Sequence, residues 1–550
     1  MAHSADYDYD YVIVGAGSAG CALANRLTED RHVRVLLIEA GGWDVHPWIH
    51  IPLAWGRILQ KRLFDWDYFA EPDHHVAGRG IECARGKVIG GSSSINAMAH
   101  VRGNRADYDR WASYGLPDWS FDQVLPYFRK QESWEGGASA FRGGDGPLTT
   151  RRSQYQDPIV EAFIQAGIAA GYPPNSDYNA QAQEGFGLLQ STIRNGRRCS
   201  AAAAYLHPAL KRRNLHVVVR ALATRVVFEK QRARAVEYVT KGQPKLARAE
   251  REVILAGGVI NSPQLLMLSG IGDPVELRAH SIDVISARPG VGKNLQDHVS
   301  GQVRYRRKTP GPFPKMMRLD RIGVEMARAY LMGTGFATDL PSGWVAFLKT
   351  DAALACPDLQ LLSNLAPLDA HPYFAPFSRG FEDGFSVRPV LLHPQSRGSV
   401  QLRSGDPAAH ARIFQNLLSE RRDIETLREG IKITRDVARQ SQLESYVGAE
   451  LDPGPACVSN SDIEANLRAT AATAHHPLGT CKMGALADDM AVVDGSLQVM
   501  GVTGLRVVDA SVMPDMVSGN INAAVIMIAE KAADLIRRPS SATSSAVPQR

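Results

Sequence analysis

The 550-residue sequence contains no run of about eighteen apolar residues, so it predicts no membrane-spanning helix. Its first ten residues are polar and acidic, without the basic stretch followed by an apolar stretch that marks a secretory signal. The six cysteines (positions 21, 83, 199, 356, 457 and 481) form no CxxC pair and no zinc-ligand spacing with histidines. We therefore expect no metal site, no secreted disulfide framework and a cytoplasmic location.

An excess of charge of one sign is also missing. Lys and Arg number 62 against 57 Asp and Glu, which leaves a formal net charge of +5 over the chain. Basic clusters are short and no basic helix carries interleaved aromatic residues, so we expect no nucleic-acid partner. The G-x-S-x-G elbow of α/β-hydrolases is absent. Hydrophobic residues make up 44% of the chain, enough for a large core, whereas residues 539–550 contain few of them and are predicted to be disordered.

The N-terminal residues carry the pattern of a nucleotide-binding β-α-β unit. Residues 9–14 form a short β-branched run typical of a buried parallel strand, residues 18–28 have a helical apolar face, and residues 33–38 predict a second strand. Between the first strand and the helix, Gly15-Ala16-Gly17-Ser18-Ala19-Gly20 matches G-x-G-x-x-G. The first glycine permits a tight turn, the second admits a pyrophosphate to the backbone, and the third lets the helix pack on the strand.

Glu39 ends the second strand and narrows the choice of nucleotide. It lies 19 residues (39 − 20) after Gly20, where a carboxylate can accept hydrogen bonds from both ribose hydroxyl groups. The same charge would repel a 2′-phosphate, which argues against NADP. Because FAD and NAD share the ADP half that this motif recognises, the β-α-β unit alone does not distinguish between them.

Five further segments favour FAD. They are residues 85–103 (RGKVIGGSSSINAMAHVRG, followed by DYDRW at 107–111), 257–272 (GGVINSPQLLMLSGIG), 289–298 (PGVGKNLQDH), 476–484 (HPLGTCKMG) and 505–535, which contains VDASVMP and GNINA. In this order, and spread over nearly the whole chain, they make the sequence similar to the glucose–methanol–choline (GMC) oxidoreductase family. The resemblance implies an α/β fold with a Rossmann-like FAD-binding domain and an active site that oxidises alcohols.

The resemblance also places a set of residues along FAD. They are Arg85, Val88, Gly91, Ser92, Asn96, Ala97 and Met98 in the second glycine-rich loop, Val226 on the adenine, and Asp509 and Ala510 beside the ribityl chain and the ring. Val226 and Asp509 have simpler interpretations as well, a core strand residue and a helix cap. Some family members attach FAD through a histidine beside the loop, but this chain has Ile95 there, so we expect noncovalent FAD.

A catalytic pair follows from the same resemblance. His476 matches the proton-accepting histidine of the family, and a neutral histidine is a suitable general base near pH 7. The partner is His or Asn in relatives, and we expect Asn522 to donate a hydrogen bond to the substrate oxygen. The neighbouring His475 is expected to line the pocket or to pack, and Asn520 to hold the turn or the flavin.

Two positions depart from the family pattern. Val259 replaces a usually small residue and His100 a common aromatic one, and both are expected away from the flavin and the catalytic pair. The substrate is not encoded in any motif. Four ring side chains fall in the expected substrate region, where core packing explains them equally well. They are Trp344, Phe347, His371 and Tyr373.

By resemblance, the FAD-binding domain is discontinuous and comprises residues 7–155, 223–300 and 465–538. A substrate domain of mixed or antiparallel sheet with helices takes residues 156–222 and 301–464. We expect oxidation of an alcohol to an aldehyde or ketone by hydride transfer to flavin N5, with reoxidation by O2 or a quinone-type acceptor. The alternatives are a hydroxynitrile lyase that keeps FAD without redox chemistry, and a non-catalytic flavin protein, against which the intact catalytic pair argues.

Overall fold

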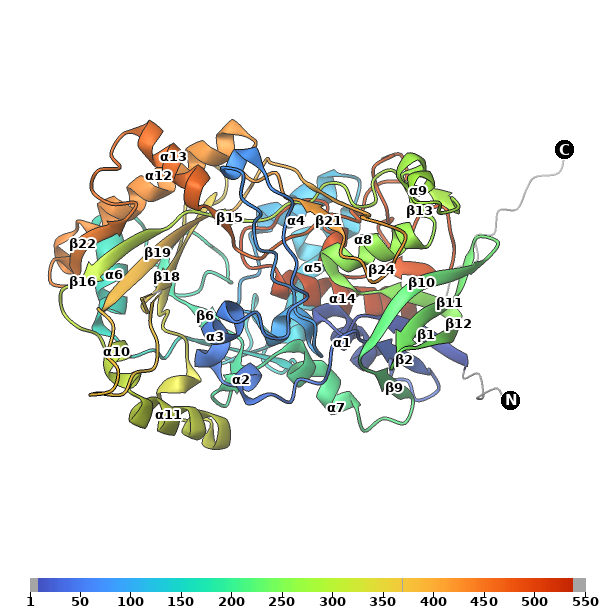
Figure 1. Cartoon of the computed structure of the whole chain (residues 1–550), viewed down its shortest axis with the longest axis horizontal. Helices are drawn as coiled ribbons and strands as arrows, with labels where there is room; N and C mark the ends of the chain where they lie inside the picture. Colours follow the sequence, from blue (N-terminus) through green and yellow to red (C-terminus); the bar gives the residue numbers. More distant parts are fainter. Residues whose placement is uncertain (1–7, 368, 538–550) are drawn as a thin grey trace.

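The computed structural model describes residues 8–367 and 369–537. Figure 1 shows two sheets at opposite ends of the molecule, with helices and loops from several parts of the chain between them. This arrangement matches the predicted division into a nucleotide-binding part and a second part, and the predicted α/β fold class is confirmed.

The first sheet is built around the predicted β-α-β unit. Its strands are β1 (Asp8–Val14), β2 (Val35–Ile38), β9 (Leu215–Val218), β10 (Ala221–Glu229), β11 (Arg232–Thr240), β12 (Gln243–Leu255) and β24 (Leu505–Val507). They follow the order β10-β11-β12-β1-β2-β9, and β24 pairs with β12. β1 is parallel to both β2 and β12, and its residues Val12 and Ile13 are fully buried, as expected for a strand covered on both faces.

The C-terminal helix returns to this sheet. Helix α14 (Asn522–Arg537) packs against α1 (Ser18–Leu27), and the carboxylate of Glu530 on α14 accepts from the guanidinium of Arg26 on α1 at 2.7 Å. Glu530 is buried, so this charge pair holds the two helices in one relative position. As a result, the first residues of both helices, Ser18 and Asn522, lie next to each other.

The second sheet is antiparallel. Its strands are β5 (Gly185–Leu188), β15 (Val299–Ser300), β16 (Val303–Arg307), β17 (Trp344–Leu348), β18 (Leu359–Asn364), β19 (Gly384–Leu391), β22 (Val447–Asp452) and β23 (Ala472–Thr473). They follow the order β22-β16-β19-β18-β17-β5, and β15 bridges β19 and β23. Helix α12 (Arg421–Ala438) covers one face, because a Cβ at Gly430 would touch Leu359 and Pro389. Helices α6 (Pro158–Ala169) and α13 (Asn460–Thr470) flank it (Figure 1).

The remaining elements connect and cover the two sheets. The helices are α2 (Pro47–His50), α3 (Trp55–Gln60), α4 (Arg105–Ser113), α5 (Phe121–Gln131), α7 (His207–Ala209), α8 (Gly258–Leu268), α9 (Pro274–Ala279), α10 (Pro312–Met316) and α11 (Leu319–Met332). The strands are β3 (Glu132–Trp134), β4 (Leu148–Arg152), β6 (Gln190–Ser191), β7 (Ile193–Arg194), β8 (Arg197–Arg198), β13 (Ile271–Gly272), β14 (Ser286–Ala287), β20 (Ser399–Gln401) and β21 (Arg412–Phe414). None of the helices in the described ranges has the length and apolar character that crossing a lipid bilayer requires.

The structure differs from the sequence prediction in one long segment. Residues 41–84 are rich in Trp, Pro, His and Gly, a composition that predicts a surface loop without regular structure, but they contain α2 and α3, and Ile49 and Ile58 are buried. Their many Trp, Pro and His residues mask the helical pattern, and tertiary packing, not intrinsic propensity, stabilises such short helices. The predicted disordered tail at 539–550 lies outside the described residues.

The proposed domain boundaries stay a prediction, and two short strands lie across them. β9, at residues 215–218, pairs with β2 of the first sheet although it falls in the predicted substrate domain. β23, at residues 472–473, pairs with β15 of the second sheet although it falls in the predicted FAD-binding domain. The chain therefore crosses between the two parts close to residue 473, just before the predicted catalytic histidine.

Candidate active site

A cavity of about 540 Å³ lies between the two sheets. It brings together most of the side chains that the sequence predicted for the cofactor and for catalysis. The predicted residues that line it are Gly15, Gly17, Ser18, Ala19, Glu39, Arg85, Gly91, Ser92, Asn96, Ala97, Met98, Asp509, Ala510, His476 and Asn522. Gly20, Val88 and Val226 are not among the lining residues.

The three glycines of the first loop have three different environments. Gly15 has a φ of +101°, and a Cβ there would overlap the carbonyl oxygen of Ala256. A Cβ at Gly20 would overlap the carbonyl oxygen of Gly15, so this glycine permits close packing of α1 on β1. A Cβ at Gly17 would meet no protein atom closer than 4.0 Å and would stand in the cavity. Gly17 therefore keeps space free for a ligand that approaches the backbone, as the pyrophosphate of a dinucleotide does.

The carboxylate of Glu39 lies beside this loop and is fixed by two backbone hydrogen bonds. One carboxylate oxygen accepts from the backbone N–H of Ala16 at 2.8 Å and the other from that of Gly41 at 2.7 Å. Burial raises the pKa of Glu39 to about 7, against the opposing effect of these two hydrogen bonds. Each oxygen keeps a lone pair for a further donor, so the carboxylate can still accept from ribose hydroxyl groups.

Two residues that were predicted to contact the cofactor, Val226 and Val88, are buried in the protein core. Val226 is buried and its backbone N–H donates to Ser269 Oγ. A register shift between Ala223 and Arg225 changes the alternation of β10, so that Leu222 and Ala223 line the cavity instead. Val88 packs in a buried cluster with Ile95 and other residues beneath the second loop. Neither residue lines the cavity, and Val226 fits its simpler interpretation as a core strand residue.

The two asparagines of the Asn520-Ile521-Asn522 motif point to different partners, and the one beside His476 is not the predicted Asn522. Asn522 Oδ1 accepts from Ser18 Oγ at 2.7 Å, so its side chain lies against the nucleotide loop. Asn520 Nδ2 lies 3.0 Å from His476 Nε2. Asn520 is thus the residue paired with the histidine, because the α14 helix begins at Asn522 and carries that side chain towards α1.

Asn520 is held by a side chain of the second sheet and by the turn that precedes it. Its Oδ1 accepts from Nε2 of the buried Gln360 on β18 at 3.3 Å, which turns Nδ2 towards His476. The turn that precedes it is fixed by Asp107, which accepts from the backbone N–H of Ser518 at 2.7 Å and from its hydroxyl at 2.9 Å. Asp107 belongs to the DYDRW segment of the sequence, which gives that segment a positioning function.

A second histidine, His298, determines which nitrogen of His476 is free. His298 Nε2 lies 3.1 Å from the carbonyl oxygen of Leu392, which can only accept, so Nε2 carries the proton. Its Nδ1 is then an acceptor, and His476 Nδ1, at 3.0 Å, is the donor. The remaining nitrogen of His476, Nε2, holds a lone pair and accepts from Asn520. His298 closes the PGVGKNLQDH segment, but no sequence pattern assigns it a role in the site.

Burial keeps the histidines of the site neutral. It lowers the pKa of His476 well below its usual value, with smaller contributions from His298 and the Arg85 guanidinium. Burial likewise lowers the pKa of His298 and of His475 to about 3. In contrast, burial raises the pKa of Asp297, which accepts from the backbone N–H of His476, to about 6. The site therefore presents an uncharged imidazole with a free lone pair, which is the form a general base requires.

His475 lines the cavity next to His476. Its φ is +62°, uncommon for a residue with a side chain, and its carbonyl oxygen accepts from Arg85 Nη2 at 2.6 Å. Its Nδ1 is buried and has no hydrogen-bond partner within the described ranges. Of the two predictions for His475, the position in the cavity wall is the one that the structure favours.

The cavity walls also contain side chains that the sequence did not reveal. Those from α3 and the segment after it are Trp55, Leu59, Trp66 and Tyr68, and those from the second sheet and the loop before it are Leu340, Leu362, Asn364 and Arg388. Val259 lines the cavity too, which corrects its expected remote position. Trp344 and Phe347 are core residues with no exposed surface, and neither they nor His371 and Tyr373 line the cavity. No spacing rule predicts such walls, because they come from segments far apart in the chain.

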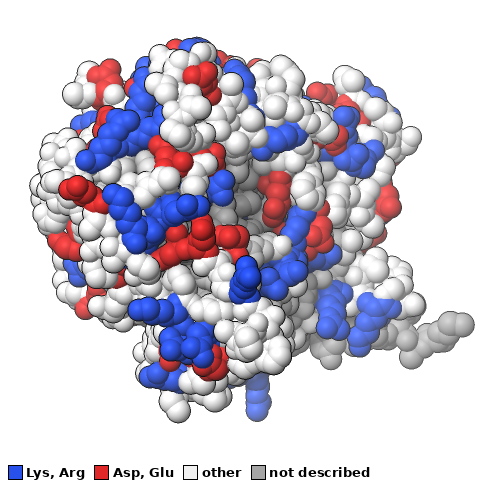
Figure 2. Space-filling view, turned by 60° about the vertical axis from the view of Figure 1, so that its left-hand side comes forward, with Lys and Arg blue, Asp and Glu red and all other residues white. Residues whose placement is uncertain are grey.

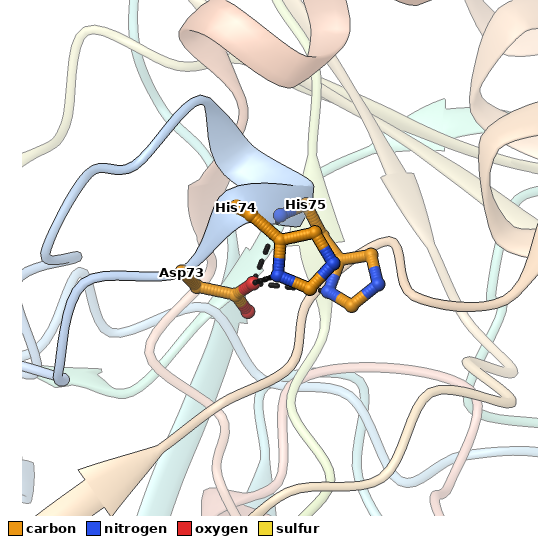
Figure 3. A group of neighbouring side chains, drawn as sticks. All are labelled: Asp73, His74 and His75. Carbon is orange, nitrogen blue, oxygen red and sulfur yellow. Dashed lines mark hydrogen bonds and ion pairs between the residues drawn. The ribbon is translucent and has the colours of Figure 1, made fainter.

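His100, His74 and His75 are not among the residues that line the cavity. His100 is buried with its Nε2 3.2 Å from Glu132, which also binds Arg102 and Arg142, so it belongs to a structural charge cluster. Asp73, His74 and His75 form a group whose ligand atoms could meet on one ion (Figure 3). Asp73 Oδ1 already accepts from the backbone N–H of His75 and lies 2.9 Å from its ring, so this carboxylate caps a turn.

Charged side chains of both signs cover the face of the molecule shown in Figure 2. On the face shown in Figure 2, Lys and Arg are intermixed with Asp and Glu, without a broad area of one sign. The small net charge of the chain agrees with this distribution. The ligand of this protein is defined by the cavity, whose glycine loop, ribose-type carboxylate and neutral histidine–amide pair are the features of a dinucleotide-dependent oxidoreductase.

Comparisons with known proteins identify the family. The GMC oxidoreductase family models match residues 9–300 and 394–529. The chain is 43% identical over 540 residues to the mitochondrial choline dehydrogenase of Mus musculus, covering 96% of this chain and 89% of the relative. It is 42% identical over 539 residues to the oxygen-dependent choline dehydrogenase of Brucella ovis, covering 96% and 95%. The chain belongs to the GMC oxidoreductase family.

Solved structures agree with this identification. The crystal structure of pyridoxine 4-oxidase from Mesorbium loti superposes with a TM-score of 0.85 at 33% identity, covering 96% of this chain and 99% of that one. A formate oxidase of Aspergillus oryzae gives a TM-score of 0.87 at 28% identity, covering 97% and 99%. The protein is an FAD-dependent alcohol oxidoreductase, and the space above Gly17, the Glu39 carboxylate and the long cavity fit that cofactor.

Proposed function

We propose that His476 is the general base that takes the hydroxyl proton during the FAD-dependent oxidation of a primary alcohol, and that Asn520 holds the alcohol oxygen. The observation that carries this proposal is the 3.0 Å contact between Asn520 Nδ2 and the lone pair of His476 Nε2 inside the cavity. FAD, when bound, supplies the hydride acceptor. The alcohol hydroxyl takes the place of this contact, donating its hydrogen to Nε2 and accepting from Nδ2.

The surrounding residues prepare His476 for this step. Its Nδ1–H is engaged by His298, so the proton of the alcohol can go only to Nε2. After the transfer, the positive charge of the imidazolium lies against the buried Asp297, which accepts from the backbone N–H of His476 at 2.8 Å. The carboxylate thereby stabilises the protonated state that forms during the reaction.

Asn522 is proposed to bind the cofactor and not the substrate. Its side chain is fixed by Ser18 at the first turn of α1, where the free backbone N–H groups of the helix favour the pyrophosphate. The sequence prediction of Asn522 as the substrate-orienting residue is therefore replaced by Asn520.

The test is a panel of alcohols assayed twice with the purified holoenzyme, once following peroxide and once following a dye acceptor. Production of an aldehyde with consumption of either acceptor supports the proposal and decides whether O2 or a quinone-type acceptor reoxidises the enzyme. Anaerobic incubation with the best alcohol should bleach the flavin, whereas a hydroxynitrile lyase would leave it yellow. The cytoplasmic location stays a prediction that cell fractionation tests.

A further inference from the structure

The positive and negative charges in the cavity are unevenly distributed. Within the described residues, the acidic side chains that line the cavity are Glu39 and Asp509. Glu39 lies beside the first glycine loop, and Asp509 is engaged by the backbone N–H of Gly258 and by Ser262 Oγ. The walls around His476 therefore contribute no carboxylate, but they do contribute the guanidinium of Arg388.

Arg388 has no acidic partner within the described part of the chain. It lies on β19 opposite Leu362 of β18, which also lines the cavity, so its side chain belongs to the face that α12 does not cover. Its Nη2 donates to Ser300 Oγ at 2.6 Å and approaches the carbonyl oxygen of Thr473 at 3.4 Å. Both partners are neutral. Burial lowers its pKa, and no carboxylate contributes an opposing effect.

The other cavity cations are neutralised. Arg85 lies near the buried Asp297, whose pKa its charge lowers, and its terminal nitrogen is bound to the carbonyl oxygen of His475. The charge of Lys87 acts on Glu39, and its ammonium group lies 4.3 Å from the ring centre of Trp66. Arg388, which has no carboxylate beside it, keeps its Nε–H and both Nη1–H groups without a hydrogen-bond partner within the described ranges. A partly buried guanidinium that is left with free donors in a cavity is a binding site for an anionic oxygen.

The same short strands position Arg388 and the catalytic histidines. Ser300 ends β15, directly after His298-Val299, and Thr473 ends β23, two residues before His475. The charge of Arg388 lowers the pKa of both His475 and His476, so it acts on the reacting end of the cavity. An anionic group held by Arg388 would place the rest of a small molecule between it and the His476–Asn520 pair.

We propose that Arg388 binds the carboxylate of the substrate, so that the preferred substrates are alcohols that also carry a carboxylate group. This inference rests on the alcohol oxidation proposed above and names its substrate class. It separates this chain from the activity in the names of its choline dehydrogenase relatives, since choline carries a quaternary ammonium group. A cation in this cavity would face Arg388 without any carboxylate in the cavity wall around His476 to balance it. The apolar walls formed by Trp55, Trp66 and Leu362 favour an aromatic or aliphatic body between the two polar ends.

The first experiment uses the wild-type holoenzyme and three alcohols: 4-(hydroxymethyl)benzoate, its uncharged amide 4-(hydroxymethyl)benzamide, and choline. We expect kcat/KM for the carboxylate to exceed that for the amide by about 10-fold or more, because a charge-assisted hydrogen bond is lost with the amide. Choline should be the poorest of the three. A preference for the amide or for choline would overturn the inference, while oxidation of any of them would still support the proposed function.

The second experiment uses Arg388→Met, Arg388→Lys and a matched control, with benzoate as a ligand that cannot be oxidised. The control is Arg306→Met, on the neighbouring strand β16, where Arg306 is half exposed and forms an ion pair with Glu382. Benzoate binding is followed by the perturbation of flavin absorbance. Arg388→Met should raise the dissociation constant by about 10-fold or more, Arg388→Lys by less, and Arg306→Met should match the wild type.

The outcomes separate the two proposals. Benzoate binding that is equal in the wild type and Arg388→Met would refute the anion site, whatever the enzyme does with alcohols. Arg388-dependent benzoate binding by an enzyme whose flavin no alcohol bleaches would support the anion site and refute the proposed oxidation. If Arg388→Met does not retain FAD, Arg388→Lys and the wild-type preference between carboxylate and amide decide the question.

Discussion

The side-chain amide of Asn520 donates to Nε2 of His476, while the amide of Asn522, two residues later, turns away and accepts from Ser18. One turn thus supplies a contact to the catalytic base and a contact to the nucleotide loop. The separation arises because Asn522 is the first residue of α14 and Asn520 is still in the preceding turn.

This difference predicts opposite effects for the two asparagines. In Asn520→Ala, FAD should be retained while flavin reduction by alcohol slows by roughly 10- to 100-fold, because one donor to the substrate oxygen is lost. In Asn522→Ala, FAD binding should weaken, and the reduction rate of the fraction that still contains FAD should change less. Flavin content per protein and anaerobic stopped-flow absorbance measure the two effects. The reverse pattern would restore Asn522 as the residue that orients the substrate.

The sequence predicts that this turn belongs to the active site, but it does not show which of the two asparagines faces His476. The GNINA segment and its place near the C-terminus were evident, and so was the histidine that it meets. Which asparagine faces that histidine depends on where α14 begins, and helix ends are poorly encoded in local sequence. Val226 shows the same limit, since a register shift in β10 changed the side of the strand that faces the cavity.

His298 is predicted to act by fixing the tautomer of His476. In His298→Phe the Nδ1–H of His476 loses its acceptor, so we expect flavin reduction to slow by about 10-fold or more. His298→Gln should recover part of the loss, because an amide can both accept from His476 and donate to Leu392. Equal losses in the two variants, with an unchanged pH profile, would indicate that His298 only packs against its neighbour.

The pH dependence of the reaction follows from the buried base. His476 must be unprotonated to act, and burial lowers its pKa well below 6.5. The value of kcat/KM should therefore stay constant as the pH falls through 6.5, and it should decrease only when the pH approaches the lowered pKa of His476. The measurement is kcat/KM with an uncharged alcohol from about pH 5 to about pH 9, with FAD content checked at each end. A break close to the ordinary histidine pKa would contradict a buried neutral His476.

FAD is predicted to be bound without a covalent link. Ile95 lines the cavity at the position where some family members carry the tethering histidine, and an alkyl side chain cannot form that bond. Precipitation of the holoenzyme with acid should release the yellow cofactor into the supernatant. A pellet that stays yellow after washing would show that another residue has formed the link.

The substrate region was the part least accessible to sequence reasoning. Trp344 and Phe347 are aromatic residues of the kind that often line ligand pockets, yet they are core residues of β17. The residues that do form the wall, such as Trp55 and Arg388, come from segments more than 300 positions apart. The nucleotide site was predictable because a single β-α-β unit forms most of it, whereas the substrate site depends on how separate segments pack.

The role of His476 is tested most directly by anaerobic reduction of the flavin in His476→Ala, with His475→Ala as the matched neighbour. We expect that His476→Ala retains FAD and that an alcohol bleaches its flavin at least roughly 100-fold more slowly than in the wild type. In His475→Ala, with the lone pair of His476 still in place, bleaching should slow far less. Unchanged bleaching in His476→Ala with bound flavin would contradict the assignment of His476 as the base.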